Sequence, residues 1–263
     1  MDLKLSGKRA LICGGSSGLG RAVGAALARE GARVVLLSRD AGRLAQAAGE
    51  MTAAGPGRAD FVTADLADHA GLLAAVDEAE RLLDGPVEIL LNNTGGPPPS
   101  GVAGLEPSVW RDHFESMTLS VFRLTDRVLP AMRAAGWGRI LNVASVTVVE
   151  PSASLGVSNT LRASVVAWAK TLAGEVAADG VTVNTLLPGR IDTPRIERLD
   201  RAAAERTGTT PEQARAESLK AIPVGRLGTI EEFGATAAFL ASPLAAYITG
   251  SMIRLDGGAV KAI

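Results

Sequence analysis

The chain has 263 residues, 47% of them hydrophobic, and its 27 basic residues almost balance 28 acidic ones, which leaves a net charge of −1. The single cysteine excludes an intrachain disulfide and a cysteine zinc cluster, and the two histidines lack the spacing of metal ligands. The small net charge gives no reason to expect nucleic acid or an anionic membrane as partner. Residues 1–10 lack a signal-peptide apolar region, and no apolar run is long enough for a membrane span, so we expect a soluble, cytoplasmic protein.

Short apolar runs alternate with longer helical patterns along the chain, which predicts an α/β domain with a mostly parallel sheet and crossover helices. The predicted strands are Arg9–Cys13, Arg33–Leu37, Phe61–Ala64, Val87–Leu91, Arg139–Ala144, Val181–Leu186 and Met252–Leu255. The predicted helices are Gly18–Glu30, Ala41–Ala53, His69–Leu83, Val109–Ala135, 154–178 and Ile230–Ala241. Residues 194–222 are charged and helical with a break near Gly208, and we predict that they form an insertion that covers the substrate.

A glycine-rich segment, residues 14–20, joins the first predicted strand to the first predicted helix. Glycines at this place permit a tight turn and a close approach of the backbone to a pyrophosphate. The N-terminus of the following helix presents unpaired N–H groups and a positive dipole to an anion. The segment therefore predicts a dinucleotide site, and a glycine-rich turn without a ligand is the alternative.

The second predicted strand ends in Ser38 and Arg39, followed by Asp40. An acidic residue at this tip binds the ribose hydroxyls of NAD(H), whereas a basic residue suits the 2′-phosphate of NADP(H). Ser38 and Arg39 therefore favour NADP(H) over NAD(H), with a solvated surface charge as the alternative for Arg39. We expect Asp40 to cap the next helix. Asp65, after the third predicted strand, is a candidate either for the adenine amino group or for a helix cap.

In combination, these segments resemble the short-chain dehydrogenase/reductase family. The family's glycine motif is similar to residues 14–20, its Asn-Asn-Ala-Gly segment to residues 92–95, and its Pro-Gly segment to residues 183–193. The resemblance extends over nearly the whole chain and is closest to members that resemble 3-oxoacyl-carrier-protein reductase. It implies a Rossmann-like, doubly wound parallel sheet of about seven strands flanked by helices, as a single domain over residues 1–263. It also implies an NADP(H)-dependent oxidoreductase that acts on a small carbonyl or alcohol and associates into a homotetramer or homodimer.

The resemblance further implies which side chains and backbone segments hold the cofactor. They lie in the glycine motif, at the ends of strands and in the Pro-Gly segment, and no metal ligand is among them. The implied residues are Gly14, Ser16, Ser17, Gly18, Leu19, Gly20, Ser38, Arg39, Asp65, Leu66, Asn92, Thr94, Gly95, Arg162, Pro188, Gly189, Ile191 and Thr193.

Three of the family's four catalytic residues, Asn, Ser, Tyr and Lys, have no equivalent in this chain. Counting back from Lys170 places Ser158 at the tyrosine position and Arg162 at the lysine position, while Ser145 is retained and Met117 replaces the asparagine. A serine hydroxyl is far less acidic than a phenol, and an arginine stays protonated and cannot relay a proton. Loss of a positioned general acid typically lowers a rate by about 10²–10⁴-fold. We therefore expect cofactor binding to be kept and ordinary carbonyl reduction to be impaired.

Three functions remain open. The first is a reductase with an altered proton donor, for which water, a substrate group, His113 and Glu150 are candidates. The second is a nucleotide-binding homologue with a non-redox activity, such as isomerisation or dehydration, and the third is a catalytically silent scaffold. His113 lies four residues before Met117 and so shares a helix face with it. Arg190 is a candidate for binding a substrate anion, and the single tyrosine, Tyr247, is expected to pack and not to react.

Overall fold

The computed structural model describes residues 2–262 and contains one parallel seven-stranded sheet. The strand order is β3-β2-β1-β4-β5-β6-β7, so the order reverses between β1 and β4. The strands are β1 (Arg9–Cys13), β2 (Arg33–Ser38), β3 (Arg58–Thr63), β4 (Ile89–Asn92), β5 (Gly138–Val143), β6 (Val181–Pro188) and β7 (Met252–Leu255). This doubly wound sheet confirms the predicted fold class, and the reversal places a crevice at the carboxyl ends of β1 and β4.

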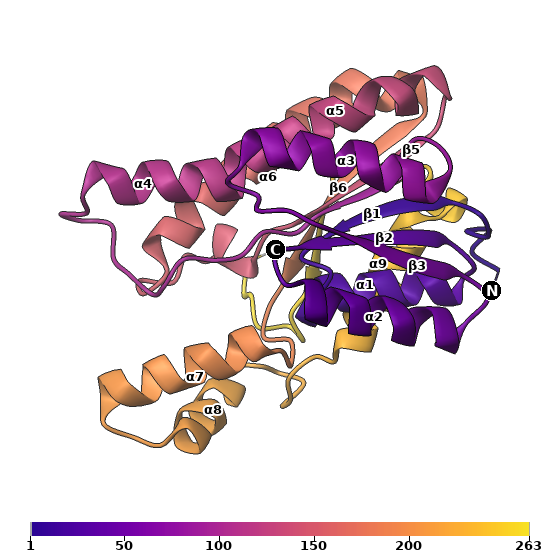
Figure 1. Ribbon diagram of the computed structural model, residues 1–263. Helices are drawn as coiled ribbons and strands as arrows, with labels where there is room; N and C mark the ends of the chain where they lie inside the picture. Colours follow the sequence, from indigo (N-terminus) through magenta and orange to yellow (C-terminus); the bar gives the residue numbers. More distant parts are fainter. Residues whose placement is uncertain (1, 263) are drawn as a thin grey trace.

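Helices cover both faces of the sheet (Figure 1). One face carries α1 (Gly18–Arg29), α2 (Ala41–Ala54) and α9 (Ile230–Ala241), and the other carries α3 (His69–Leu83), α5 (Ser120–Ala134) and α6 (Gly156–Val176). Beyond the carboxyl edge of the sheet extend α4 (Pro107–Phe114), α7 (Pro194–Thr207) and α8 (Pro211–Leu219). Within residues 2–262, none of these helices is long and apolar enough to cross a membrane.

Two apolar cores hold the helices on the sheet. Successive side chains of a strand point to opposite faces, so Ile12 of β1 joins the core under α1, α2 and α9, whereas Leu11 joins the core under α3, α5 and α6. Both side chains are fully buried. Burial of such a side chain contributes about 1.5–3 kcal/mol, so the strands form a firm base for the loops at their carboxyl ends.

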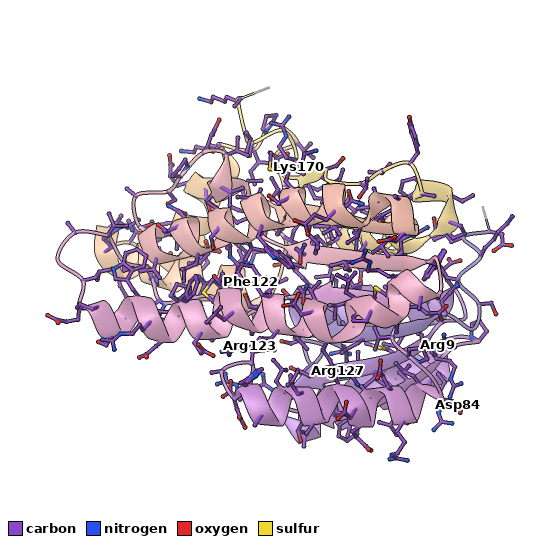
Figure 2. All side chains as sticks on the ribbon, turned by 90° about the horizontal axis from the view of Figure 1, so that it is seen from above. Arg9, Asp84, Phe122, Arg123, Arg127 and Lys170 are labelled. Carbon is purple, nitrogen blue, oxygen red and sulfur yellow. The ribbon has the colours of Figure 1, made fainter. Side chains whose placement is uncertain are left out.

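Contacts between helices fix α5 in place. The guanidinium of Arg127 on α5 lies 2.5 Å from Asp77 and 2.9 Å from Glu80 of α3, and Figure 2 shows it between the two helices. On the side of α6, the rings of Phe122 and Trp168 lie 4.5 Å apart between centroids. Because α5 is held from two sides, the turn at its N-terminal end is also held in position.

The long helix predicted over residues 109–135 is present as an unbroken helical segment, but it is not α-helical throughout. A π-helical turn, Glu115–Leu119, separates α4 from α5 and places Met117 and Thr118 in the interior. The apolar pattern continues through this turn, so periodicity could not show it, and such turns occur often at functional sites. The third strand begins earlier than predicted, because Arg58 already pairs with Arg33 of β2.

Candidate active site

A cavity of about 580 Å³ opens at the carboxyl edge of the sheet, where the strand order reverses. Its lining comes from the loop after β1, the tips of β2, β4 and β5, the start of α6, the segment after β6 and the start of α7. Ligands of open α/β sheets bind in this crevice. In the described part of the chain, no group of three or more His, Cys, Asp or Glu residues could hold a metal ion.

The loop after β1 has a backbone shape that requires glycine. Gly14 has a φ of +64°, and a Cβ added there would lie 2.6 Å from Nδ2 of Asn93. Ser17 begins α1 without a side-chain capping hydrogen bond, so amides of the first turn are free for an anion. The loop therefore fits the pyrophosphate of a dinucleotide. Gly20 does not line the cavity; a Cβ there would lie 2.3 Å from the Gly14 carbonyl oxygen, so Gly20 permits close packing of the helix.

The tip of β2 forms the end of the cavity that suits an adenosine. Ser38, Arg39 and Arg43 line this end together with Asp65 and Leu66. The guanidinium Nη1 of Arg39 lies 3.7 Å from Oδ2 of Asp65, and 80% of the Arg39 side chain is exposed. Arg39 is therefore only weakly held and is free to contact a phosphate at this position.

The structure decides between two interpretations of the acidic residues near this end. Asp40 caps α2 as predicted, because its carboxylate accepts a hydrogen bond from the Arg43 amide at 3.0 Å. Asp65 is not a helix cap, since Asp68 caps α3 and Asp65 accepts instead from the amide of Ala67 at 3.0 Å. The cavity-lining position of Asp65 is compatible with the other interpretation, contact with an adenine.

Asn92 does not line the cavity, although the family resemblance implied it. Its Nδ2 donates to Oγ1 of Thr125 at 3.1 Å and to Oδ1 of Asn142 at 2.9 Å in the interior. Asn93 lines the cavity instead, and its Nδ2 donates to the carbonyl of Cys13 at 3.3 Å. The two asparagines are adjacent in sequence, so the place where β4 ends determines which of them faces the cavity.

Ser145 and Ser158 bring two hydroxyl groups to the cavity. The Oγ of Ser145 accepts hydrogen bonds from the amide and the hydroxyl of Thr147, at 3.2 and 3.0 Å. The Oγ of Ser158 accepts from Nε of Arg162 at 3.3 Å, one helical turn along α6. Within residues 2–262, neither hydroxyl proton has an acceptor, so both hydroxyls can donate to a ligand in the cavity.

Arg162 places a positive charge behind the hydroxyls. Besides Ser158, it donates through Nη1 to the Val143 carbonyl at 2.8 Å and through Nη2 to the Gly95 carbonyl at 3.3 Å. Desolvation lowers the pKa of Arg162 to about 10, and the charge of Arg195 contributes in the same direction. The guanidinium therefore stays charged at neutral pH, beside the Ser158 hydroxyl.

Met117 and His113 complete this end of the cavity. Met117 is buried in the π-helical turn against Val157 and Leu161 of α6, and its thioether has no proton to donate. His113 lies one turn earlier, on α4, and its half-buried imidazole lines the same cavity. The four sequence-predicted catalytic residues, Met117, Ser145, Ser158 and Arg162, are thus brought together on one wall.

Three other candidates from the sequence lie elsewhere. Glu150 accepts from the Lys261 amide at 2.7 Å and is outside the cavity lining. Arg190 pairs with the buried carboxylate of Asp200, so it does not present its charge to the cavity. Tyr247 does not pack as expected, because its side chain is fully exposed on this chain.

The end of β6 and the segment after it form another wall of the cavity, with Pro188, Gly189, Ile191 and Thr193. The methyl group of Thr193 lies 3.6 Å from the position that a Cβ on Gly18 would take, so the two walls approach closely at the glycine motif. Sequence reasoning missed two arginines of α7, Arg195 and Arg198, which also line the cavity. They lie two and five residues after Thr193, a predicted cofactor-binding residue, and this closeness in sequence could have pointed to them.

Comparisons with known proteins agree with this geometry. A family profile described as enoyl-(acyl carrier protein) reductase matches residues 14–260. A 3-oxoacyl-[acyl-carrier-protein] reductase of Vibrio cholerae is 35% identical over 256 residues, 97% of this chain and 98% of that one. L-sorbose reductase of Gluconobacter frateurii, complexed with NADPH and L-sorbose, has a TM-score of 0.93 at 32% identity and 100% coverage of both chains. A 3-oxoacyl (acyl-carrier-protein) reductase of Agrobacterium tumefaciens C58 with NADP bound has a TM-score of 0.87 at 29% identity, covering 97% and 95% of the two chains.

Proposed function

The chain belongs to the short-chain dehydrogenase/reductase family, and from this premise we propose that it is an NADP(H)-dependent oxidoreductase of a small carbonyl or alcohol with a non-standard active site. The observation that carries the proposal is the single cavity that joins the glycine loop before α1 to Ser145, Ser158 and Arg162. A dinucleotide at the loop and a substrate at the serines would therefore meet in one cavity.

NADP(H) is the cofactor that fits this cavity. The similar structures from Gluconobacter frateurii and Agrobacterium tumefaciens contain NADPH and NADP. In this chain, Arg39 and Arg43 would hold the 2′-phosphate, the first amides of α1 the pyrophosphate, and Arg162 the ribose next to the nicotinamide. When bound there, NADPH supplies the hydride for reduction of a carbonyl carbon.

The two serines and Arg162 polarise the substrate. Ser145 and Ser158 donate hydrogen bonds to the carbonyl oxygen, where negative charge develops during reduction. Arg162 donates to Ser158 and so makes that hydroxyl a stronger donor, and its own charge stabilises the oxygen. A positioned donor of this kind is worth about 10²–10³-fold in kcat.

His113 supplies the proton that completes the alcohol, directly or through one water molecule. Arg162 stays protonated, and Met117 has no proton to give. An imidazole N–H can donate a proton, and His113 is the one imidazole among the described residues that line the cavity. This assignment accounts for a carbonyl reductase without the tyrosine of the family.

The experiment combines titration of NADPH by its fluorescence with NADPH oxidation on a panel of ketones, aldehydes and oxo acids. We expect submicromolar to micromolar binding and turnover of at least one compound. His113→Gln should lower kcat by about 10²–10⁴-fold. His69→Gln is the matched control, because His69 lies exposed at the start of α3 and outside the cavity.

The outcomes separate the competing functions. An absence of NADPH binding below the millimolar range would overturn the proposal. Binding without any turnover would favour a non-redox activity or a silent scaffold. An unchanged kcat in His113→Gln would leave the reductase in place and show that the proton comes from water or from the substrate.

We further propose that residues 194–222 cover the substrate and that the chain self-associates as a homotetramer or homodimer. The guanidinium of Arg195 on α7 donates to the Pro97 carbonyl at 3.1 Å, across the cavity opening. The outer face of α6 exposes Ala163, Ala167 and Gly174, which would permit the close approach of a second copy. A monomer in light scattering would contradict the proposed assembly.

A further inference from the structure

Three arginines at the substrate end of the cavity, Arg162, Arg195 and Arg198, have no carboxylate partner within residues 2–262. Arg162 and Arg195 donate to backbone carbonyls, and Arg198 makes no side-chain hydrogen bond in that part of the chain. We propose that Arg195 and Arg198 bind an anionic group, a carboxylate or a phosphate, that the substrate itself carries. The inference rests on the proposed function and narrows its substrate class to oxo acids and oxo phosphates, together with the corresponding alcohols.

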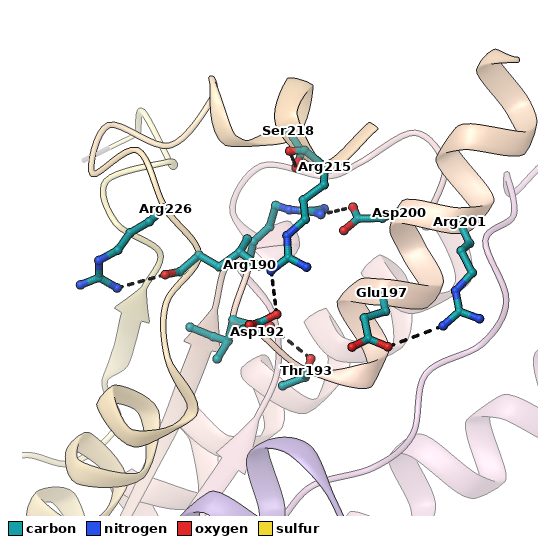
Figure 3. A network of polar contacts seen from close by, with 11 residues as sticks. Arg190, Asp192, Thr193, Glu197, Asp200, Arg201, Arg215, Ser218 and Arg226 are labelled. Carbon is teal, nitrogen blue, oxygen red and sulfur yellow. Dashed lines mark hydrogen bonds and ion pairs between the residues drawn. The ribbon is translucent and has the colours of Figure 1, made fainter. Parts of the chain in front are cut away.

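The helix α7 separates its charges by face. The two acidic residues nearest to these arginines are paired with other cations, since Glu197 lies 3.5 Å from Arg201 and Asp200 pairs with Arg190 (Figure 3). Neither acid lines the cavity, whereas Arg195 and Arg198 do. Glu197 and Asp200 are therefore not available to Arg195 and Arg198, and α7 presents two cations to the cavity.

The cations facing the cavity repel one another. Burial lowers the pKa of Arg195, and the charge of Arg198 lowers it further. The charge of Arg195 in turn acts on Arg162. An anion between these groups would replace repulsion by attraction, and the planar guanidinium suits carboxylate and phosphate oxygens.

Charge elsewhere in the cavity does not compensate for these arginines. Asp65 is the single acidic residue among the described lining residues, and it lies 3.7 Å from Arg39 at the adenosine end. That end has its own pair of cations, Arg39 and Arg43, for a cofactor phosphate. The positive charge at the start of α7 is therefore left for another anion.

The cofactor pyrophosphate is the rival partner for Arg195, because Thr193 approaches Gly18 of the glycine loop. Arg195 is also bound to the loop after β4 through the carbonyls of Gly96 and Pro97. Arg198 lies nearly one helical turn further along α7 and carries no such contact. Arg198 is therefore the residue at which a substrate anion and a cofactor anion can be told apart.

The test measures NADPH-dependent reduction of two pairs of compounds: acetoacetate with methyl acetoacetate, and dihydroxyacetone phosphate with dihydroxyacetone. We expect kcat/KM to favour the anion in at least one pair by about tenfold or more, and the pair that responds identifies carboxylate or phosphate. Arg198→Gln should remove most of this preference through KM. Arg201→Gln, on the same helix but outside the cavity, should retain it.

Each outcome has a defined meaning. Equal kcat/KM for the anion and the neutral compound in both pairs would overturn the inference. So would a loss of NADPH affinity in Arg198→Gln that matches its loss of kcat/KM, because the arginine would then serve the cofactor.

Failure of the proposed function is detected separately, as absence of NADPH binding or of turnover in the unmodified protein. If no compound of the two pairs is reduced, calorimetry with malonate and inorganic phosphate on the NADP⁺-saturated protein replaces kinetics. Binding that weakens about tenfold in Arg198→Gln, but not in Arg201→Gln, would support the inference. No binding of either anion in the millimolar range would overturn it.

Discussion

Replacement of Arg39 by alanine should weaken NADPH and leave NADH nearly unaffected. Arg39 lines the cavity at the tip of β2, and its exposed guanidinium has Asp65 as its nearest partner, at 3.7 Å. The 2′-phosphate is the group that distinguishes NADPH from NADH, so a residue that binds this phosphate must discriminate between the two. A surface charge without a ligand would not discriminate.

The size of the effect follows from this geometry. A hydrogen bond to a charged group is worth about 1.5–3 kcal/mol. The exposed pair with Asp65 must be given up, which costs about 0–1 kcal/mol. The difference, about 0.5–3 kcal/mol, corresponds to an increase of about 2- to 160-fold in the Kd of NADPH for Arg39→Ala.

Fluorescence titration with both nucleotides measures this change without a known substrate. Arg58→Ala is the matched control, because Arg58 is also an exposed arginine paired with an aspartate, Asp60 at 2.9 Å, and lies outside the cavity. We expect its Kd values to stay within about twofold of those of the unmodified protein. A 2′-phosphate site at Arg39 is refuted if Arg39→Ala weakens NADPH and NADH by the same factor, or if it weakens neither.

Three further predictions concern the active site, the single thiol and acid stability. Ser158→Ala should lower kcat by about 10²–10³-fold in steady-state assays at unchanged NADPH affinity, and a change below about threefold would contradict the role of its hydroxyl. Burial raises the pKa of the Cys13 thiol to about 12, so a disulfide reagent at mildly alkaline pH should modify the unfolded chain only, and fast modification of the native protein would contradict this. The Arg226 guanidinium lowers the pKa of Glu232 from 4.5 to about 2, so the stability from this carboxylate is present above pH 4.5 and is lost as the pH falls from 4.5 to 2. In thermal melts, Glu232→Gln should therefore have a lower Tm than the unmodified protein at neutral pH. The two Tm values should approach each other in acid.

The fold could be predicted from the sequence because its parallel strands are buried on both faces. Continuous apolar runs such as 34–37 and 89–91 mark such strands, and glycine follows within two residues of the ends of α1, α2 and α3. Local periodicity could not show the π-helical turn Glu115–Leu119, since one extra residue in a helix leaves the apolar pattern almost intact. Pairing with β2, a non-local contact, sets the start of β3 at Arg58.

The part of the candidate site that is formed by the backbone, the glycine loop after β1, could be predicted from the sequence. Gly14 and Gly18 need a positive φ, and this requirement is visible in the residue type. The direction in which a side chain points was not visible. Asn92 points into the interior and Asn93 toward the cavity, while Arg190 pairs with Asp200. Only the packed structure decides which of several polar residues has its partner within the chain.

The environment of Arg162 argues against a site that has merely lost its function. A partly buried cation with a lowered pKa is costly, because its charge is removed from water and faces a second cation, Arg195. An apolar residue at this position would avoid that cost. The guanidinium instead orients one donor on Ser158 and two on the carbonyls of Val143 and Gly95, so its position is fixed in three directions. A fixed charge beside the Ser158 hydroxyl would stabilise negative charge on a substrate oxygen, and this favours a working reductase over a silent scaffold.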